Sequence, residues 1–327
     1  MNWNLVSKYR SHLMGFSILF IVLFHFCEMI GTHKELVEAW QLHLYQFGRY
    51  GYIGVEIFLF VSGIGCFFSY KKNPDILQFY KKRFIKILPT YCMVAIPFWI
   101  IFDVFILNKP NSFFIDFLGI SFFNDVRVFW YVFLILGLYF IHPLLYNYLY
   151  NIKGSVFLKF LFLEVLLLGF IGWLSIAHTH FFDITEVALT RIPIYIFGVY
   201  CGHLVYNKES IPMLIVILFI LTLFVLPLNA EKTYLMRVFN SLQSIGIIFI
   251  CTFVFEYILP RFVNSILCFI GKYSFEIYLG HVAIRKIMNQ CGIPTYQLNI
   301  YFIIVVLTII LTCCVSFISE KIQKRLV

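Results

Sequence analysis

Charged residues are scarce in this chain of 327 residues, of which only 13% are Asp, Glu, Lys or Arg while 61% are hydrophobic. An ordinary soluble domain carries about 25% charged residues, so this composition excludes one. In place of charge the sequence has apolar runs of about 20 residues, the length at which a helix crosses a bilayer. The composition therefore predicts an integral membrane protein.

The sequence also lacks the patterns that would indicate additional modules. It contains no Gly/Ser-rich linker, no repeat of fixed period and no low-complexity tract. These are the usual signs of attached domains or of solenoids. We therefore expect residues 1–327 to form a single integral-membrane domain.

Several signatures of familiar enzyme and binding classes are missing too. There is no GxSxG, HExxH, P-loop or GxGxxG pattern, so serine hydrolases, zinc proteases and nucleotide hydrolases that use these motifs are excluded. The nine cysteines form no CxxC pair and fall mostly in apolar runs, which is typical of small buried residues. The 25 Lys and Arg residues outnumber the 16 Asp and Glu residues but gather at the ends of apolar runs. Neither nucleic-acid binding nor a metal site is expected.

The apolar runs predict an all-α polytopic membrane protein with about ten transmembrane helices. They lie near 13–32, 51–69, 87–107, 128–148, 155–177, 187–206, 211–228, 238–258, 265–285 and 299–319. Lys and Arg are more frequent in the set of alternate connections that includes both chain ends, so the positive-inside rule predicts cytoplasmic termini. By the same rule His142, near the end of the fourth run, is expected at the membrane interface.

Three ionisable residues interrupt the first two apolar runs: His25, Glu28 and Glu56. Such a residue costs roughly 2.5 to 3.5 kcal/mol on membrane-insertion scales, so it usually has a pairing or functional role. At about 1.5 Å of rise per residue, His25 reaches the midplane or beyond, and Glu28 lies one turn further out. Pairing between helices is one explanation. The wider set of polar residues at this depth favours chemistry at His25.

That wider set comes from segments distant in the sequence. It consists of Glu56 in the second run, Arg127, Trp130 and Tyr131 at the start of the fourth, Arg191 at the start of the sixth, and Tyr278, His281 and Arg285 in the ninth. The spacing of the last three places them on one helical face, as it does for His25 and Glu28. We expect these faces to turn away from lipid and to share one layer of the molecule.

Several sequence blocks occur in a characteristic order along the chain. They are LMGFSILFIVLFHF with His25, GYIGVEIFLFVSGIG with Glu56, FYKKRFIKILPTY with Arg83, FWYVFLILGLYFIHPL, RIPIYIFGVYCG with Arg191, and IGKYSFEIYLGH with His281. In this order and spacing they resemble the acyltransferase 3 family of membrane-bound acyltransferases. The resemblance covers most of the chain. It implies a multi-pass protein of the bacterial plasma membrane that transfers an acyl group, commonly acetyl from acetyl-CoA, to hydroxyls of cell-envelope or exported carbohydrates.

One family feature is missing from the first apolar run. The family usually has an Arg eleven residues before the His, preceded by an acidic residue, and here those places hold Met14 and Ser11. Arg10 lies one turn closer to the cytoplasm and is the candidate to replace it.

Acyl transfer to a hydroxyl needs a base for the hydroxyl proton and a group that stabilises charge on the tetrahedral oxygen. We expect His25 to be the base, oriented by Glu28 or Glu56. Arg191 or His281 would steady the developing charge or bind the acceptor. A transient acyl-histidine on His25 is a variant of the same mechanism.

Acyl-CoA is expected as a co-substrate, with no tightly bound cofactor. Its phosphates require a basic cytoplasmic surface, and the loop 70–86 supplies Arg83 as first choice, then Lys82 and Lys86. Arg10, just before the first run, is a further candidate. The alternative for this loop is that it only sets topology or meets anionic lipid.

The acceptor is expected to be an envelope glycan or a lipid-linked sugar. Trp130 and Tyr131 form either an interfacial belt or a sugar platform, with Tyr278 and Arg127 as further acceptor-binding candidates. Two other functions stay open at this point. One is a transporter or flippase that uses the buried His, Glu and Arg residues as a relay, although no internal repeat supports it. The other is a family member that binds donor without turnover.

Overall fold

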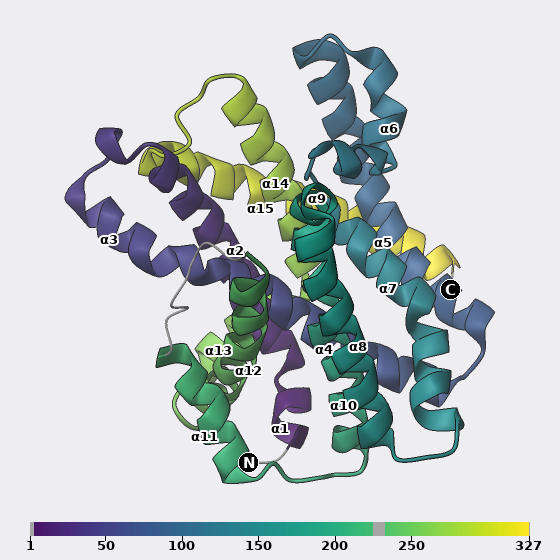
Figure 1. Cartoon of the computed structure of the whole chain (residues 1–327). Coiled ribbons are helices and arrows are strands. Elements are labelled where there is room, and N and C mark those ends of the chain that lie inside the picture. The colour runs from purple at the N-terminus through teal and green to yellow at the C-terminus, as the bar shows by residue number, and fades with distance from the viewer. Residues whose placement is uncertain (1–2, 225–232, 327) are drawn as a thin grey trace. The chain divides into compact units, whose positions relative to one another are not determined.

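The computed structural model describes residues 3–224 and 233–326, and within these ranges it is helical with no β-strand (Figure 1). The α-helices are α1 (Trp3–Lys8), α2 (Arg10–Thr32), α3 (Ala39–Gly48), α4 (Ile53–Lys72), α5 (Ile76–Trp99), α6 (Phe113–Phe117), α7 (Trp130–Tyr146), α8 (Val156–Ala177), α9 (Thr179–Leu189), α10 (Ile192–Tyr206), α11 (Met213–Leu221), α12 (Thr233–Tyr257), α13 (Arg261–Lys272), α14 (Ser274–Gln290) and α15 (Leu298–Leu326). The shorter 3-10 and π segments are η1 (Lys34–Leu36), η2 (Arg49–Tyr52), η3 (Ile100–Ile106), η4 (Pro110–Ser112), η5 (Ile120–Asn124), η6 (Asn147–Asn151) and η7 (Thr222–Phe224).

Within the described ranges, eight helical segments are long and apolar enough to cross a membrane. The prediction of an all-α polytopic membrane protein is therefore confirmed. Two of the expected spans look different in the structure. The span expected at 211–228 corresponds to the short apolar segment Met213–Phe224, and its residues 225–228 lie outside the described residues. The number of spans and the side on which the termini lie stay predictions.

The span expected at 265–285 is divided at Tyr273. This residue has φ −105° and ψ 15°, outside the helical range, and it separates α13 from α14. Apolar periodicity continues through the break, so the sequence pattern did not reveal it.

The basic segment 70–86, which we expected to be a loop, is mostly helical. α4 continues to Lys72, and α5 begins at Ile76. The start of α5 is stabilised by Asp75, whose carboxylate accepts a hydrogen bond from the backbone N–H of Gln78 at 3.1 Å. The loop prediction was wrong, because charged residues are also good helix formers where a helix leaves the apolar layer.

The packing of the chain divides it into two compact units, each built from three separate stretches. The first unit comprises Met1–Ser17, Ile53–Tyr80 and Leu134–Gly271, and the second comprises Ile18–Tyr52, Lys81–Phe133 and Lys272–Val327. Whether these units behave as the one domain expected from the sequence stays a prediction.

In the first unit, α4 packs against α10, and α10 also contacts α8 (Figure 1). Glycines permit the close approach of α4 and α10. A Cβ atom added to Gly198 would overlap the carbonyl oxygen of Phe60, and one added to Gly63 would overlap the carbonyl oxygen of Tyr195. Small residues at such positions are the usual means by which membrane helices pack closely.

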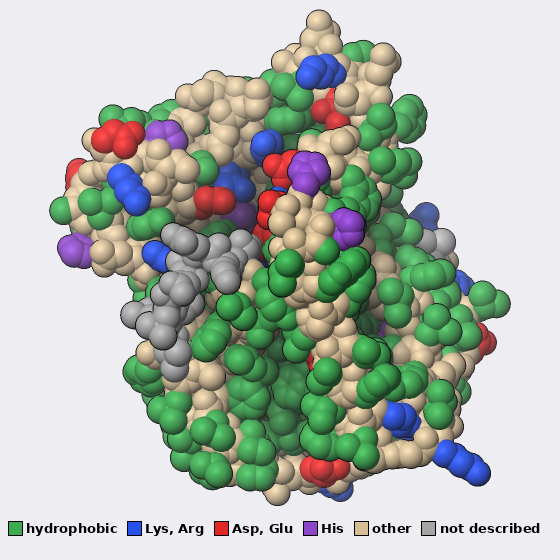
Figure 2. All heavy atoms as spheres, viewed as in Figure 1, with side chains coloured by type: hydrophobic (Ala, Val, Ile, Leu, Met, Phe, Trp, Pro, Cys, Tyr) green, Lys and Arg blue, Asp and Glu red, His purple; other side chains and the backbone are tan. Residues whose placement is uncertain are grey.

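Exposed apolar side chains cover α8 and α11, where Figure 2 shows hydrophobic side chains gathered over the lower part of the view. They include Phe157, Leu158, Phe162, Val165 and Ile176 of α8 and Met213, Leu214 and Leu218 of α11. A helix surface on which most exposed side chains are apolar fits contact with lipid.

In the second unit, α2 packs against α14 and α15. Phe26 and Ile30 of α2 form a buried core with Tyr301 and Ile304 of α15. The Tyr301 hydroxyl donates a hydrogen bond to the Val22 carbonyl oxygen at 2.6 Å. This packing fixes the face of α2 that carries His25.

Candidate active site

The second unit brings together His25 and Glu28 of α2 and Arg285 of α14. Nδ1 of His25 lies 3.2 Å from Oε2 of Glu28, one helical turn along the same face. A carboxylate oxygen only accepts, so Nδ1 of His25 carries the proton and donates it. Nε2 of a neutral His25 then holds the lone pair. This is the arrangement by which a carboxylate fixes the tautomer of a basic histidine.

Glu28 is itself held by a cation. Nη1 of Arg285 donates to Oε2 of Glu28 at 2.9 Å, the same oxygen that faces His25. Nε of Arg285 is buried and has no hydrogen-bond partner among the residues that the structure describes. The guanidinium therefore orients the carboxylate with one nitrogen while a second N–H group stays available as a donor.

His281 of α14 faces His25. The ring centroids of the two imidazoles are 5.2 Å apart, with the ring planes inclined by 39°. Nδ1 of His281 lies 3.1 Å from the carbonyl oxygen of Ile277, one turn earlier in α14, and must carry a proton to bond there. The residue is only 1% exposed. Its Nε2 has no hydrogen-bond partner in the described part of the chain.

Aromatic rings connect this pair of histidines to the start of α7. The Trp130 and Tyr131 ring centroids are 6.3 Å apart, those of Tyr131 and Tyr278 are 5.5 Å apart, and those of Tyr278 and His281 are 6.1 Å apart. The predicted acceptor-binding aromatics thus form one line that ends at His281. Arg127, by contrast, pairs with Asp125 at 2.7 Å.

The predicted CoA-binding cations of the second unit lie near one end of α5. Lys82 and Lys86 are exposed, and Arg83 is half-buried. Nε2 of Gln323, near the end of α15, is 3.4 Å from the Lys86 carbonyl oxygen. The last turn of α15 adds basic residues, so cations from two helices gather here. Lys82, Arg83, Lys86 and the end of α15 are called the basic cluster below.

The remaining predicted catalytic residues, Glu56 and Arg191, lie in the first unit and pair with each other. Oε1 of Glu56 on α4 lies 3.0 Å from Nε of Arg191, which precedes α10, and both side chains are at least 97% buried. Nη1 of Arg191 also donates to the Val187 carbonyl oxygen at 2.6 Å. Each charge of the pair therefore has a close partner within its own unit.

A second buried ion pair in the first unit was not predicted. Arg237 of α12 binds Glu186 of α9 through two hydrogen bonds of 2.7 Å and 3.0 Å. Both residues stand at the ends of apolar runs, where a charge is expected without any partner. The one signal in the sequence was that the two side chains have opposite charges and lie at the same predicted side of the membrane.

Arg10 belongs to the first unit. Its Nε donates to the Ser7 carbonyl oxygen at 3.1 Å, and its guanidinium lies 5.8 Å from the centroid of the Phe68 ring on α4. Nearby, Nζ of Lys8 donates to Oε2 of Glu256 at 2.6 Å, and this hydrogen bond raises the pKa of the Lys8 ammonium. Arg10 and the basic cluster thus stand in different units.

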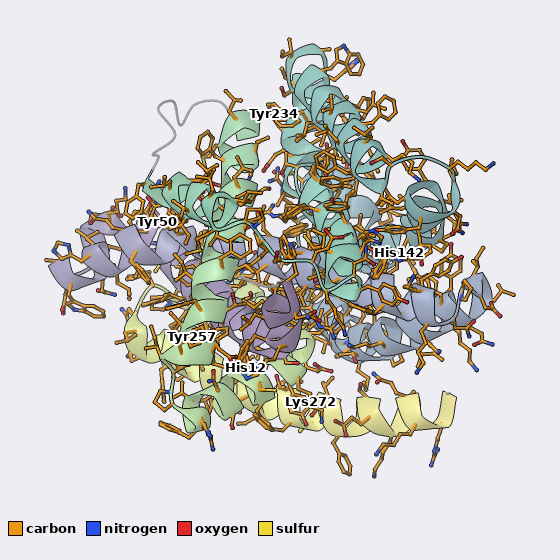
Figure 3. The ribbon with its side chains drawn as sticks, turned by 90° about the horizontal axis from the view of Figure 1, so that it is seen from below. His12, Tyr50, His142, Tyr234, Tyr257 and Lys272 are labelled. Atoms are coloured by element: carbon orange, nitrogen blue, oxygen red, sulfur yellow. The ribbon has the colours of Figure 1, made fainter. Side chains whose placement is uncertain are left out.

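His142, which we expected at the interface, is fully buried (Figure 3). Its Nδ1 is 3.0 Å from the hydroxyl oxygen of Tyr195 on α10, and its ring stacks on Phe79 with centroids 5.1 Å apart. Tyr195 and Phe79 thus enclose this histidine within the first unit, and its depth in the membrane stays a prediction.

The chain is similar to one known protein family. The model of the acyltransferase 3 family, described as an acyltransferase domain, matches residues 12–320. No curated protein and no solved structure matches the chain. The matched range includes His25 and His281 of the second unit and the two ion pairs of the first.

Proposed function

Since the chain belongs to the acyltransferase 3 family and is an acyltransferase of that general kind, we propose that it moves an acetyl or similar acyl group from acyl-CoA to a hydroxyl of a cell-envelope or exported carbohydrate. The site would lie in the bacterial plasma membrane. The observation that carries the proposal is the hydrogen-bonded series His25, Glu28 and Arg285, which supplies a basic nitrogen with a fixed tautomer.

His25 has the features of the base that acyl transfer requires. Its Nε2 lone pair can take the proton of the attacking hydroxyl, and the Glu28 carboxylate stabilises the imidazolium that forms. Arg285 keeps that carboxylate in place. Of the two carboxylates considered from the sequence, Glu28 is the one that contacts His25 within the second unit.

Charge on the tetrahedral oxygen needs a donor, and we assign this role to Arg285. Its Nε is a buried N–H group with no partner among the described residues. His281 fits the role less well, because its one N–H donates to the Ile277 carbonyl oxygen. A preorganised donor of this kind is usually a large contributor to catalysis.

The basic cluster is the proposed site for the phosphates of CoA. Arg83 offers a planar guanidinium for bidentate phosphate binding, and Lys82 and Lys86 add exposed positive charge. The basic cluster and the histidine pair belong to the same unit, so one compact body carries both parts of the proposed donor site. Acyl-CoA acts as a co-substrate in this proposal.

The line of rings from Trp130 to Tyr278 is the proposed contact for the acceptor. Aromatic faces pack against the apolar faces of sugar rings, and the Tyr hydroxyls can bond sugar hydroxyls. The line ends at His281, beside the base. A glycan or a lipid-linked sugar that lies along these rings would present a hydroxyl to His25.

The proposal is tested by comparing O-acetyl signals of envelope glycans by NMR in wild-type, deletion and His25→Ala strains. We expect the signals to disappear in both altered strains and to persist in His180→Ala, which changes an exposed histidine. Unchanged acetylation in the deletion strain, or solute uptake without acyl transfer by the purified protein, would contradict the proposal.

A further inference from the structure

The candidate site contains two imidazoles, although a mechanism with one general base needs only one. Nδ1 is the protonated nitrogen in both rings, since the partners are the Glu28 carboxylate and the Ile277 carbonyl oxygen. Each neutral ring therefore presents a lone pair at Nε2. The rings lie side by side, with centroids 5.2 Å apart.

The two histidines differ in what stabilises a positive charge on them. His25 bonds to a carboxylate, so an imidazolium or an acylimidazolium at this ring has a counter-ion. His281 bonds to a neutral carbonyl group inside the helix and is 1% exposed. His25 is thus suited to carry a covalent positive intermediate, and His281 is suited to accept a proton briefly.

Nε2 of His281 is also a buried polar atom without a partner in the described ranges. Such atoms are rare in folded proteins because leaving water without a new hydrogen bond is costly. A substrate hydroxyl would complete the missing hydrogen bond. The ring line from Trp130 to Tyr278, which leads to His281, is where the proposed function places the acceptor.

We propose that the two histidines divide the reaction, with His25 as the nucleophile and His281 as the base for the acceptor hydroxyl. This inference rests on the proposed function and changes the role of His25 in it from general base to nucleophile, with the proton of the acceptor hydroxyl passing to His281 instead. In the first half-reaction, Nε2 of His25 attacks the thioester carbonyl carbon, an N–C bond forms and the C–S bond breaks. The sulfur leaves as the CoA thiolate, and the acylimidazolium on His25 is stabilised by Glu28.

In the second half-reaction, the acceptor oxygen attacks the acyl carbon and its proton passes to Nε2 of His281. The C–N bond breaks and its electron pair returns to Nε2 of His25. The proton on His281 then passes through water to the CoA thiolate, so one acyl-CoA and one hydroxyl give one ester and one CoA thiol. His25 has no free lone pair while it is acylated, which is why a second base is required.

The test uses purified full-length protein and acetyl-CoA labelled in the acetyl group, with the membrane glycan fraction of a deletion strain as acceptor. For His281→Gln we expect about one equivalent of CoA released per protein, with label retained on His25 as a hydroxylamine-sensitive adduct. Label transfer to glycan should fall by on the order of a hundredfold or more. His25→Gln should release no CoA and carry no label.

Wild-type transfer by a folded His281→Gln protein, or absence of CoA release from it, would overturn the division of roles. His281→Asn provides a second variant of similar polarity, and added imidazole should restore transfer to His281→Ala if the role is proton acceptance. Wild-type transfer by His25→Gln would instead overturn the catalytic assignment in the proposed function. His180→Gln is the matched control and should behave as wild type.

Discussion

At the residue scale, the role proposed for His25 predicts a requirement for the charge of Glu28. Replacing Glu28 with Gln keeps a side chain of similar size but removes the negative charge that faces both His25 and Arg285. We expect the rate of acyl transfer to fall by on the order of a hundredfold or more, because the imidazolium loses its counter-ion. The Michaelis constant for acetyl-CoA should change little. Initial rates measured over a range of acetyl-CoA concentrations check this.

Glu28→Asp retains the charge and is the matched variant, so it should keep more activity than Glu28→Gln. A Glu28→Gln protein that transfers acetyl within about twofold of the wild-type rate would exclude Glu28 as the partner of His25, since loss of the counter-ion to a positively charged His25 should cost much more than that.

The buried pair Glu56 and Arg191 leads to a different prediction, for stability. Glu56→Gln removes the carboxylate that pairs directly with the buried Arg191 guanidinium. Breaking such a pair typically costs about 3 to 5 kcal/mol. We expect a large loss of thermal stability in detergent for this variant, and recovery in the double variant Glu56→Gln with Arg191→Met, measured by scanning fluorimetry.

Acyl transfer should return together with stability in that double variant if the pair holds α4 and α10 together. A double variant that is stable but inactive would show that Glu56 or Arg191 has a role in catalysis, as predicted from the sequence.

Residue positions could be predicted from the sequence better than residue partners. Depth and helical phase identified His25 and His281 as inward-facing, and the structure places their rings side by side in the second unit. Depth could not decide between Glu28 and Glu56 as the partner of His25, because both fall in the outer layer. The pair of Glu186 and Arg237 was missed because nothing local in the sequence connects residues that are 51 positions apart.

At the scale of elements, the approach of α4 to α10 depends on glycine. Gly198→Ala would place a methyl group against the Phe60 carbonyl oxygen, a backbone atom that cannot move aside. Overpacking of this kind typically costs about 1 to 3 kcal/mol. We expect a lower melting temperature in detergent and a matching loss of folded protein on size-exclusion chromatography.

Gly65→Ala is the control on α4, because a Cβ atom built there meets nothing within 4 Å. Alanine favours a helix over glycine by up to about 1 kcal/mol, so this variant should be at least as stable as the wild type. Equal destabilisation by both substitutions would contradict the role given to Gly198.

A prediction about binding of the acyl donor concerns Arg83 of helix α5. Arg83→Ala would remove one of the proposed contacts to the CoA phosphates, and a contact of this kind is typically worth about 1.5 to 3 kcal/mol. We therefore expect the Michaelis constant for acetyl-CoA to rise about tenfold or more while kcat stays within about twofold. The kinetics of Lys153→Ala, at an exposed lysine of the first unit, provide the control. A fall in kcat with an unchanged Michaelis constant would mean that Arg83 acts in the chemical step or in folding and not in binding of the donor.

Long elements were predicted well, and short irregular ones were not. The apolar runs gave the membrane helices because twenty apolar residues have few other stable arrangements. The region between α5 and α7 consists of short helical segments with left-handed residues at Asn108, Gly119, Asp125 and Phe129. No periodicity marks such a region, so it could not be predicted. Trp130 and Tyr131 directly follow it, and their ring contacts emerged only from the structure.

At the scale of the whole molecule, the family match over residues 12–320 leaves little of the chain outside the acyltransferase domain. Charge placement predicts that both termini face the cytoplasm. Reporter fusions at residues 1 and 327 test this, with alkaline phosphatase expected to be inactive and green fluorescent protein bright at both ends. Opposite signals at the two ends would require an odd number of spans and would contradict the predicted topology.

The central claim is that His25 performs acyl transfer from acyl-CoA inside the membrane domain. The most direct measurement reconstitutes the purified protein in lipid vesicles with labelled acetyl-CoA and membrane glycan, and compares wild type with His25→Ala and His180→Ala. We predict that label reaches the glycan with wild type and His180→Ala and that His25→Ala reduces the rate by on the order of 10² to 10⁴-fold. Transfer at the wild-type rate by folded His25→Ala would contradict the account.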